Sequence, residues 1–124
     1  MKKILLAIAL VLLPVNLQAA GPFDGIYSVN FNGALVGYAS IHEDETTNNM
    51  IAVIFDAEPL GSDWNAISGT RIGNNASLNS IAGTISLNIN ATFNDSNGAV
   101  ATIVSCSGDC DFPNGTVLNL NRIF

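Results

Sequence analysis

The stretch Thr84-Ile-Ser-Leu-Asn-Ile-Asn-Ala-Thr-Phe93 decides the fold class of this chain. Its apolar residues, at positions 85, 87, 89, 91 and 93, alternate with polar residues at 84, 86, 88, 90 and 92. A strict two-residue alternation places the two sets on opposite faces of a strand and fits no helix. The next segment, Asn94-Asp-Ser-Asn-Gly98, is rich in residues that tolerate turn conformations, so the chain is expected to return as a partner strand over 99–106. This hairpin predicts an all-β protein.

Six further strands are expected where short apolar or alternating runs lie between turn residues, at 26–31, 35–43, 50–57, 64–71, 76–81 and 116–124. Asn32-Gly33 is the strongest short hairpin signal in the chain. Gly37 marks a bulge or a close backbone approach within its strand. In the strand 50–57 both faces are mostly apolar, so this strand is expected to be covered on both sides.

Eight short strands with short connections, and no amphipathic helix among them, predict a small antiparallel up-and-down β-barrel, because closure removes the exposed strand edges. A two-sheet β-sandwich is the alternative. The predicted architecture is similar to the small barrels of lipocalins and avidins. The domain begins with Gly21-Pro22-Phe23, which has Phe where the corresponding segment at the start of lipocalins has Trp. The resemblance implies that Arg122 of the last strand packs over that ring and closes one end of the barrel.

The first twenty residues have the three-part pattern of a secretory signal peptide. A short basic start precedes an apolar run over 4–13, and small residues then permit cleavage after Ala19 or Ala20. The apolar run is shorter than the roughly 20 residues that span a membrane. We therefore expect a signal peptide over 1–20, a single β-domain over 21–124, and export to the periplasm or the medium.

Removing the predicted signal peptide makes the remaining domain strongly acidic. Lys2 and Lys3 leave with the signal, so Arg71 and Arg122 face ten acidic residues, a formal net charge of −8. A lysine-free acidic surface repels phosphate backbones and anionic lipid headgroups. Nucleic acid is therefore not expected as a partner, and neither is a membrane after signal cleavage.

Cys106 and Cys110 predict a disulfide bond, because two nearby cysteines in an exported chain meet an oxidising compartment. A redox pair usually has Cys-x-x-Cys spacing at the start of a helix, and a zinc site needs four ligands, whereas the only histidine is His42. Asp109 and Asp111 could offer two oxygens to calcium, but no calcium-loop pattern surrounds them. No metal and no cofactor are expected.

No catalytic residues are expected either. His42 beside Glu43 comes nearest to an acid–base pair, but no nucleophilic serine motif accompanies it. The remaining acidic residues lie mostly in predicted turns, where solvation is their ordinary role. The chain is therefore not expected to be an enzyme, and a hydrolase is a minor alternative.

Aromatic residues supply the candidate ligand-binding positions, which are Trp64, Tyr38 and Tyr27, together with His42. Tyr and Trp combine apolar area with a polar tip and often mark binding surfaces, although at strand positions they also serve as core residues. Trp64 is the first choice, because the loop 59–63 places it at the rim of the barrel.

The sequence predicts a binding or interaction module for a small apolar ligand or a partner protein. A structural or adhesive assembly component is the alternative, because uncharged Asn-, Ser- and Thr-rich strand faces do little to prevent association. A small outer-membrane barrel is less favoured, since its strands need about 9–11 residues and only 84–93 reaches that length cleanly.

Overall fold

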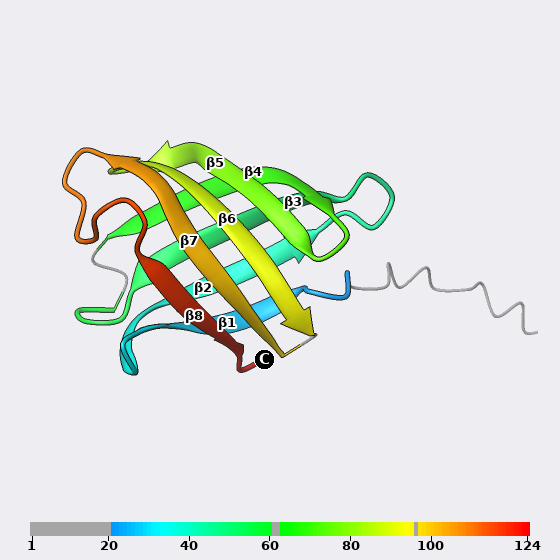
Figure 1. Cartoon of the computed structure of the whole chain (residues 1–124), viewed down its shortest axis with the longest axis horizontal. Helices are drawn as coiled ribbons and strands as arrows, with labels where there is room; N and C mark the ends of the chain where they lie inside the picture. The colour runs from blue at the N-terminus through cyan, green and yellow to red at the C-terminus, as the bar shows by residue number, and fades with distance from the viewer. Residues whose placement is uncertain (1–20, 61–62, 96) are drawn as a thin grey trace, which may run out of the picture.

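The structure is a computed structural model that describes residues 21–60, 63–95 and 97–124, and it is a closed antiparallel barrel (Figure 1). Each strand pairs with the next along the chain, and the last strand pairs with the first. The strands are β1 (Gly25–Phe31), β2 (Ala34–Glu43), β3 (Asn49–Asp56), β4 (Trp64–Ile72), β5 (Asn75–Gly83), β6 (Ser86–Asp95), β7 (Gly98–Ser107) and β8 (Val117–Arg122). The barrel prediction is confirmed. The predicted signal peptide lies outside the described residues.

The turn predicted at Asn32-Gly33 and the irregularity predicted at Gly37 are both confirmed. Asn32 and Gly33 both have positive φ, 49° and 79°, as a two-residue hairpin turn of type I′ requires. Near Gly37 the pairing of β1 with β2 shifts register, and a Cβ on Gly37 would come within 2.7 Å of the Phe55 carbonyl oxygen. The bulge and the close backbone approach predicted at this glycine are therefore both present.

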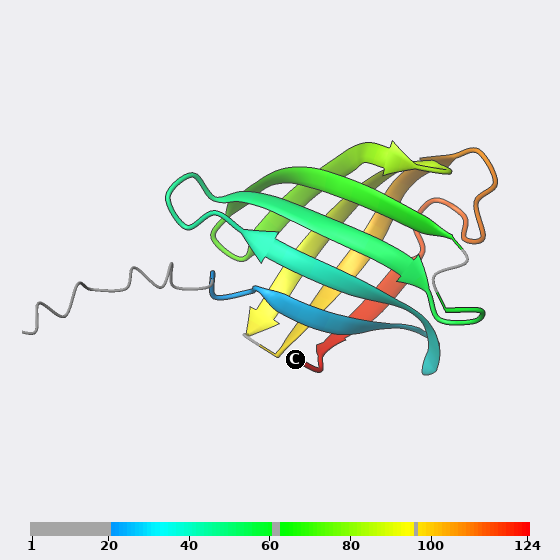
Figure 2. The same ribbon diagram turned by 180° about the vertical axis from the view of Figure 1, so that it is seen from behind.

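Different connecting segments lie at the two ends of the barrel (Figures 1 and 2). At one end, which we call the terminal end, lie the lead-in to β1, the C-terminus and the β2–β3, β4–β5 and β6–β7 connections. At the other, which we call the disulfide end, lie the β1–β2, β3–β4, β5–β6 and β7–β8 connections. The longest of these, between β7 and β8, contains Cys110, and Cys106 lies just before it at the end of β7.

Side chains fill the barrel interior. The largest fully buried ones are Tyr27, Met50, Ile67 and Phe93. Phe23 stacks on Phe93 with ring centroids 4.3 Å apart, and Tyr27 meets Phe93 edge-on at 6.4 Å. The Tyr27 hydroxyl donates to the Phe23 carbonyl oxygen at 2.9 Å. This aromatic cluster closes the terminal end.

The cation placed over the Phe23 ring is that of Arg71, with its guanidinium carbon 5.1 Å from the ring centroid. Arg122 was expected there; it instead donates to the carbonyl oxygens of Phe124 and Pro22. Arg71 reaches the ring because its strand, β4, ends on the same side of the barrel as the lead-in segment.

The predicted disulfide is present between Cys106 at the end of β7 and Cys110, with Cα atoms 6.3 Å apart. Two hydrogen bonds fasten the same loop. The Cys106 amide donates to Asn114 Oδ1 at 2.9 Å, and the Thr116 hydroxyl donates to the Pro113 carbonyl oxygen at 2.7 Å. The disulfide therefore reinforces a loop that also has bonds of its own.

Replacing Cys106 with serine is expected to lower the free energy of unfolding by about 2 kcal/mol, because the disulfide closes a short ring in the unfolded chain. In a domain of this size that corresponds to a fall in melting temperature on the order of 10 °C. Thermal unfolding followed by circular dichroism, with reduced wild-type protein as the reference, measures it. A Cys106→Ser melting temperature equal to that of the oxidised wild type would contradict this expectation.

Candidate functional site

The interior holds little free space. At the disulfide end a cavity of about 110 Å³ remains. Its lining combines aliphatic residues such as Val29, Ile54 and Leu118 with the carboxylates of four aspartates, Asp56, Asp63, Asp109 and Asp111. Pockets for drug-sized ligands usually measure roughly 300–1,000 Å³. The cavity is too small for such a ligand unless the surrounding side chains move.

The outside of the barrel carries an aromatic row instead. Tyr38 on β2 pairs in register with Phe55 on β3, and Phe55 pairs in register with Trp64 on β4. The rings of Tyr38 and Phe55 lie 5.7 Å apart. Trp64 remains 49% exposed. Three aromatic side chains thus lie side by side on β2, β3 and β4. These three strands face the viewer in Figure 2.

Two aliphatic residues of β3 extend this row toward the terminal end. Val53 and Ile51 are 36% and 42% exposed, and they alternate with the buried residues Met50 and Ala52. We call Tyr38, Phe55, Trp64, Val53 and Ile51 the outer apolar face. The sequence predicted that β3 is covered on both sides. Within the described residues only its inner side is covered, so the prediction is wrong for the outer side.

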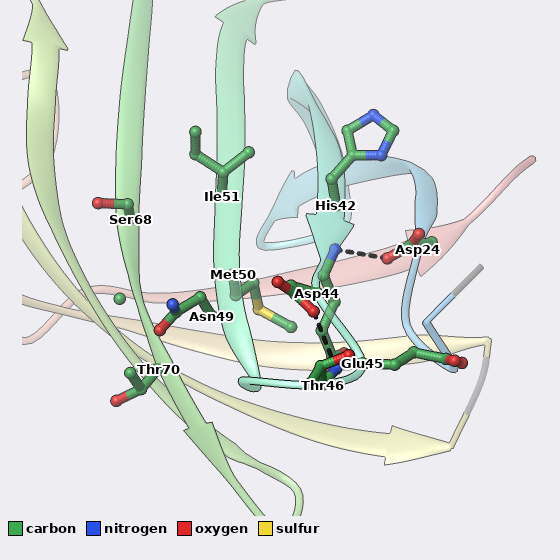
Figure 3. Close-up of a pocket in the computed structure, with 12 residues that line it drawn as sticks. Asp24, His42, Asp44, Glu45, Thr46, Asn49, Met50, Ile51, Ser68 and Thr70 are labelled. Atoms are coloured by element: carbon green, nitrogen blue, oxygen red, sulfur yellow. Dashed lines mark hydrogen bonds between the residues drawn. The ribbon is translucent and has the colours of Figure 1, made fainter. Parts of the chain in front are cut away.

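A large open hollow of about 920 Å³ adjoins the outer apolar face at the terminal end. Figure 3 shows His42, Ile51 and Ser68, which come from three neighbouring strands, along one part of it. Asp24, Asp44 and Glu45 contribute carboxylates to the same lining. The hollow therefore has the apolar side chain of Ile51 on β3, and carboxylates at the lead-in to β1 and at the β2–β3 turn.

Acidic residues lie at both ends of the outer apolar face. Asp44 and Glu45 are exposed in the turn after β2, and Glu58 and Asp63 are exposed in the connection that precedes Trp64. The Thr46 amide donates to Asp44 Oδ1 at 2.8 Å, and this bond holds the pKa of the Asp44 carboxyl below its usual value of 3.8. Asp44 is therefore ionised at neutral pH.

Both arginines in 21–124 lie at the terminal end of the barrel and have partners there. Arg71 is bound to Glu43, and its side chain is only 15% exposed. Arg122 lies at the end of β8, which pairs with β1 and β7 and not with β2, β3 or β4. Four exposed carboxylates thus lie at the two ends of the outer apolar face, and Arg71 lies beside the β2–β3 turn.

The four candidate binding residues separate into two groups. Trp64, Tyr38 and His42 all point outward from neighbouring strands, the first two within the aromatic row and His42 beside Ile51. Tyr27 is 0% exposed and belongs to the aromatic cluster inside the terminal end. A ligand on the outer apolar face can touch the first three and cannot touch Tyr27.

Burial raises the pKa of the Tyr27 phenol above its usual value of 10.0, with a smaller opposing effect from Arg122. Because the pKa of Tyr27 is higher in the folded state, the neutral phenol favours folding. This stabilisation is complete below pH 10 and is lost as the pH rises through the folded-state pKa. In a Tyr38→Phe variant, where Tyr27 is the only tyrosine, we expect phenolate absorbance to appear only above pH 10 and together with the loss of β-sheet circular dichroism. Phenolate absorbance at pH 10 from a folded barrel would contradict this.

His42 and Glu43 do not form an acid–base pair. As neighbours on a strand they point to opposite sides, so His42 faces solvent while the Glu43 side chain is fully buried against Arg71. Among the described residues, no group of three or more His, Cys, Asp or Glu side chains is arranged to hold a metal ion. Asp109 and Asp111 line the small cavity.

The sequence reasoning missed Phe55, Val53 and Ile51 as surface residues. The sequence carried a sign of this surface, because residues 50–57 are mostly apolar on both faces of the strand. In a small barrel the interior covers one face only. The second apolar face of β3 therefore lies on the outside of the barrel, and the expectation that this chain covers it is wrong.

No protein-family model, no curated protein and no solved structure matches this chain. In the described part of the chain no helix is long and apolar enough to cross a membrane.

Proposed function

We propose that this chain is an exported, non-enzymatic β-barrel that binds a partner protein through the outer apolar face. The partner surface combines apolar side chains with lysine or arginine. The observation that carries the proposal is the row of Tyr38, Phe55 and Trp64 on adjacent strands, continued by exposed Val53 and Ile51. Contiguous exposed apolar residues that include Trp and Tyr are typical of protein-binding surfaces.

The charge around the face supports a basic partner. Exposed carboxylates lie at both ends of the row, whereas Arg71 is bound to the buried Glu43 and Arg122 lies on β8. Acidic groups at the rim attract a cationic partner and repel other acidic proteins, including further copies of this chain. Arg and Lys can also stack on the aromatic rings.

The closed barrel supports docking through side chains. Because β8 pairs with β1, the sheet has no open edge to which a partner strand could add. The small interior cavity makes a partner protein a better candidate than an apolar ligand held inside.

The remaining outer surface supports exposure to water. On β5, β6 and β8 the outward positions carry mostly Asn, Ser and Thr, for example Asn79, Asn90 and Asn119. Asn88 donates to Asn79 at 2.6 Å and Thr92 to Asn75 at 2.9 Å across the strands. A barrel embedded in lipid needs an apolar band on all sides, so this asymmetry favours a water-exposed protein with one apolar face.

Export is supported by the predicted signal peptide over 1–20 and by the disulfide, which persists in oxidising compartments. The periplasm or the medium is the proposed location.

A short synthetic peptide of alternating leucine and lysine tests the proposal, and an alternating leucine and serine peptide serves as the neutral comparison. In isothermal titration calorimetry, the leucine–lysine peptide is expected to bind, and added salt is expected to weaken the binding. Trp64→Ser is expected to weaken it by about tenfold or more, because loss of a central aromatic contact costs about 1.4 kcal/mol or more.

Val104→Ser is the matched control, since Val104 is 45% exposed on β7, away from β2, β3 and β4. Equal losses in Trp64→Ser and Val104→Ser, or equal binding of both peptides, would contradict the proposal. Light scattering of the protein alone tests the alternative of a structural assembly component. Oligomers that form with increasing concentration and disappear in Trp64→Ser would favour that alternative.

A further inference from the structure

Glu43 is a buried carboxylate that is short of one partner. Its side chain is fully buried inside the terminal end. Oε1 accepts two hydrogen bonds from Arg71, one of them from Nε at 2.7 Å. Oε2 is also buried and has no hydrogen-bond donor among the described residues. A buried charged oxygen without a donor is costly, so this atom indicates a missing partner.

The backbone of Gly21 lies directly beside that oxygen. A Cβ built on Gly21 would be 3.3 Å from Glu43 Oε2, 3.0 Å from Asp24 Oδ1 and 2.8 Å from Glu43 Cβ. The Gly21 nitrogen is bonded to the same Cα as that Cβ would be, so it is only one bond from an atom that lies against the two carboxylates. The last of these distances also leaves no room for a side chain at position 21.

Charged groups of both signs meet at this point. Glu43 and Asp24 bring two carboxylates, Arg71 binds Glu43, and the Arg122 guanidinium donates to the carbonyl oxygen of the neighbouring Pro22. Two backbone bonds fix the arrangement: the Asp24 amide donates to the Gly21 carbonyl oxygen at 3.0 Å, and the Glu43 amide donates to Asp24 Oδ1 at 2.7 Å. None of these bonds reaches Glu43 Oε2, so a donor at Gly21 would satisfy this oxygen.

We propose that the chain is cut between Ala20 and Gly21, and that the new α-ammonium group of Gly21 binds Glu43 Oε2 and Asp24 inside the terminal end. A peptide nitrogen at Gly21 offers one donor and no charge, whereas a free ammonium offers three donors and a positive charge. The inference rests on the proposed export. It selects one of the two cleavage positions that the sequence permits, because a cut after Ala19 would place the charge one residue further out.

The composition of the domain gives a clean test, because residues 21–124 contain no lysine. After the cut, the α-amino group of Gly21 is the only primary amine in the protein. The full chain is expressed in cells with a secretory pathway, and the intact mass of the exported product is measured. A product that begins at Gly21 is expected; one that begins at Ala20 or at any other residue overturns the inference.

The second measurement is the rate at which the α-amino group reacts with an N-hydroxysuccinimide ester. All eight strands lie within 21–124, so a chain released at Gly21 from a fusion protein by a specific protease is used, and export is not needed. Nearby carboxylates raise the pKa of an amine above its usual value of about 7.7–8.0, and each unit reduces the reactive form about tenfold. Acylation is therefore expected to be about tenfold or more slower in wild type than in Glu43→Gln.

Glu45→Gln is the matched control, because Glu45 is an exposed carboxylate on the same hairpin, and its rate should equal that of wild type. If Glu43→Gln does not fold, a chain that retains Ala20 before Gly21 replaces it, and the same increase in rate is expected. Equal rates in wild type and in whichever comparison is used would overturn the inference. A protected amine in a chain that cells fail to export would instead contradict the proposed export alone.

Discussion

Replacing Arg71 with methionine is expected to lower the free energy of unfolding by about 3–5 kcal/mol, because it breaks a buried ion pair and leaves the Oε1 atom of a buried carboxylate without a donor. Glu43 Oε1 has two described donors, and both belong to Arg71. The same guanidinium donates to the Gly73 carbonyl oxygen and lies over the Phe23 ring. The side chain therefore joins β2, β4 and the aromatic cluster, and methionine can replace only its apolar contacts.

The double variant Arg71→Met, Glu43→Leu separates the cost of the unpaired charge from the value of the pair. An apolar pair of similar size is often neutral compared with a buried ion pair. Urea unfolding of the two variants should therefore show that the double variant recovers most of the stability lost in Arg71→Met. A loss below about 1 kcal/mol in the single variant would contradict the burial of Glu43.

Truncating Phe93 to alanine is expected to destabilise the protein by about 3–5 kcal/mol, the usual cost of removing a buried aromatic ring. Phe93 is 1% exposed, stacks on Phe23 and meets Tyr27 edge-on. The ring is the centre of the cluster that closes the terminal end, so its loss leaves a cavity that the rigid strands cannot fill. Chemical denaturation at equilibrium measures the difference.

Phe124→Ala is the matched control, because Phe124 is 86% exposed and its backbone oxygen keeps its bonds to β1 and Arg122. Its stability is expected to lie within about 0.5 kcal/mol of wild type. A similar loss in both variants would mean that Phe93 is not the central core residue that the packing indicates.

Strands and turns could be predicted from the sequence because each one is a local pattern. The alternation over 84–93 gave β6 (Ser86–Asp95), and Asn32-Gly33 gave the first hairpin. Closure into a barrel followed from short connections between consecutive strands. The disulfide between Cys106 and Cys110 needed only their spacing and the expected compartment.

The candidate site could be predicted only in part, because it depends on register between strands. Trp64 and Tyr38 were identified as single residues, yet only the pairing of Phe55 with both of them makes a row. A shift of one residue would have turned either side chain to the other face. Sequence alone does not give that register.

The pairing of Glu43 with Arg71 inside the barrel could not be predicted from the sequence either. Glu43 was identified only as a neighbour of His42, but alternation along the strand turns its side chain into the barrel toward Arg71. Arg71 and Glu43 are 28 residues apart in sequence, and only the order of β2, β3 and β4 brings them together. The same placement put Arg71, rather than Arg122, over Phe23.

The fluorescence of Trp64 tests the central claim most directly, because it is the only tryptophan in the chain and lies half-exposed on the outer apolar face. The unmodified protein is titrated with the leucine–lysine peptide while tryptophan emission and acrylamide quenching are recorded. Binding at the outer apolar face predicts emission at shorter wavelength and weaker quenching, with the same midpoint as the calorimetric titration. Unchanged emission and quenching at peptide concentrations that saturate the calorimetric signal would contradict it.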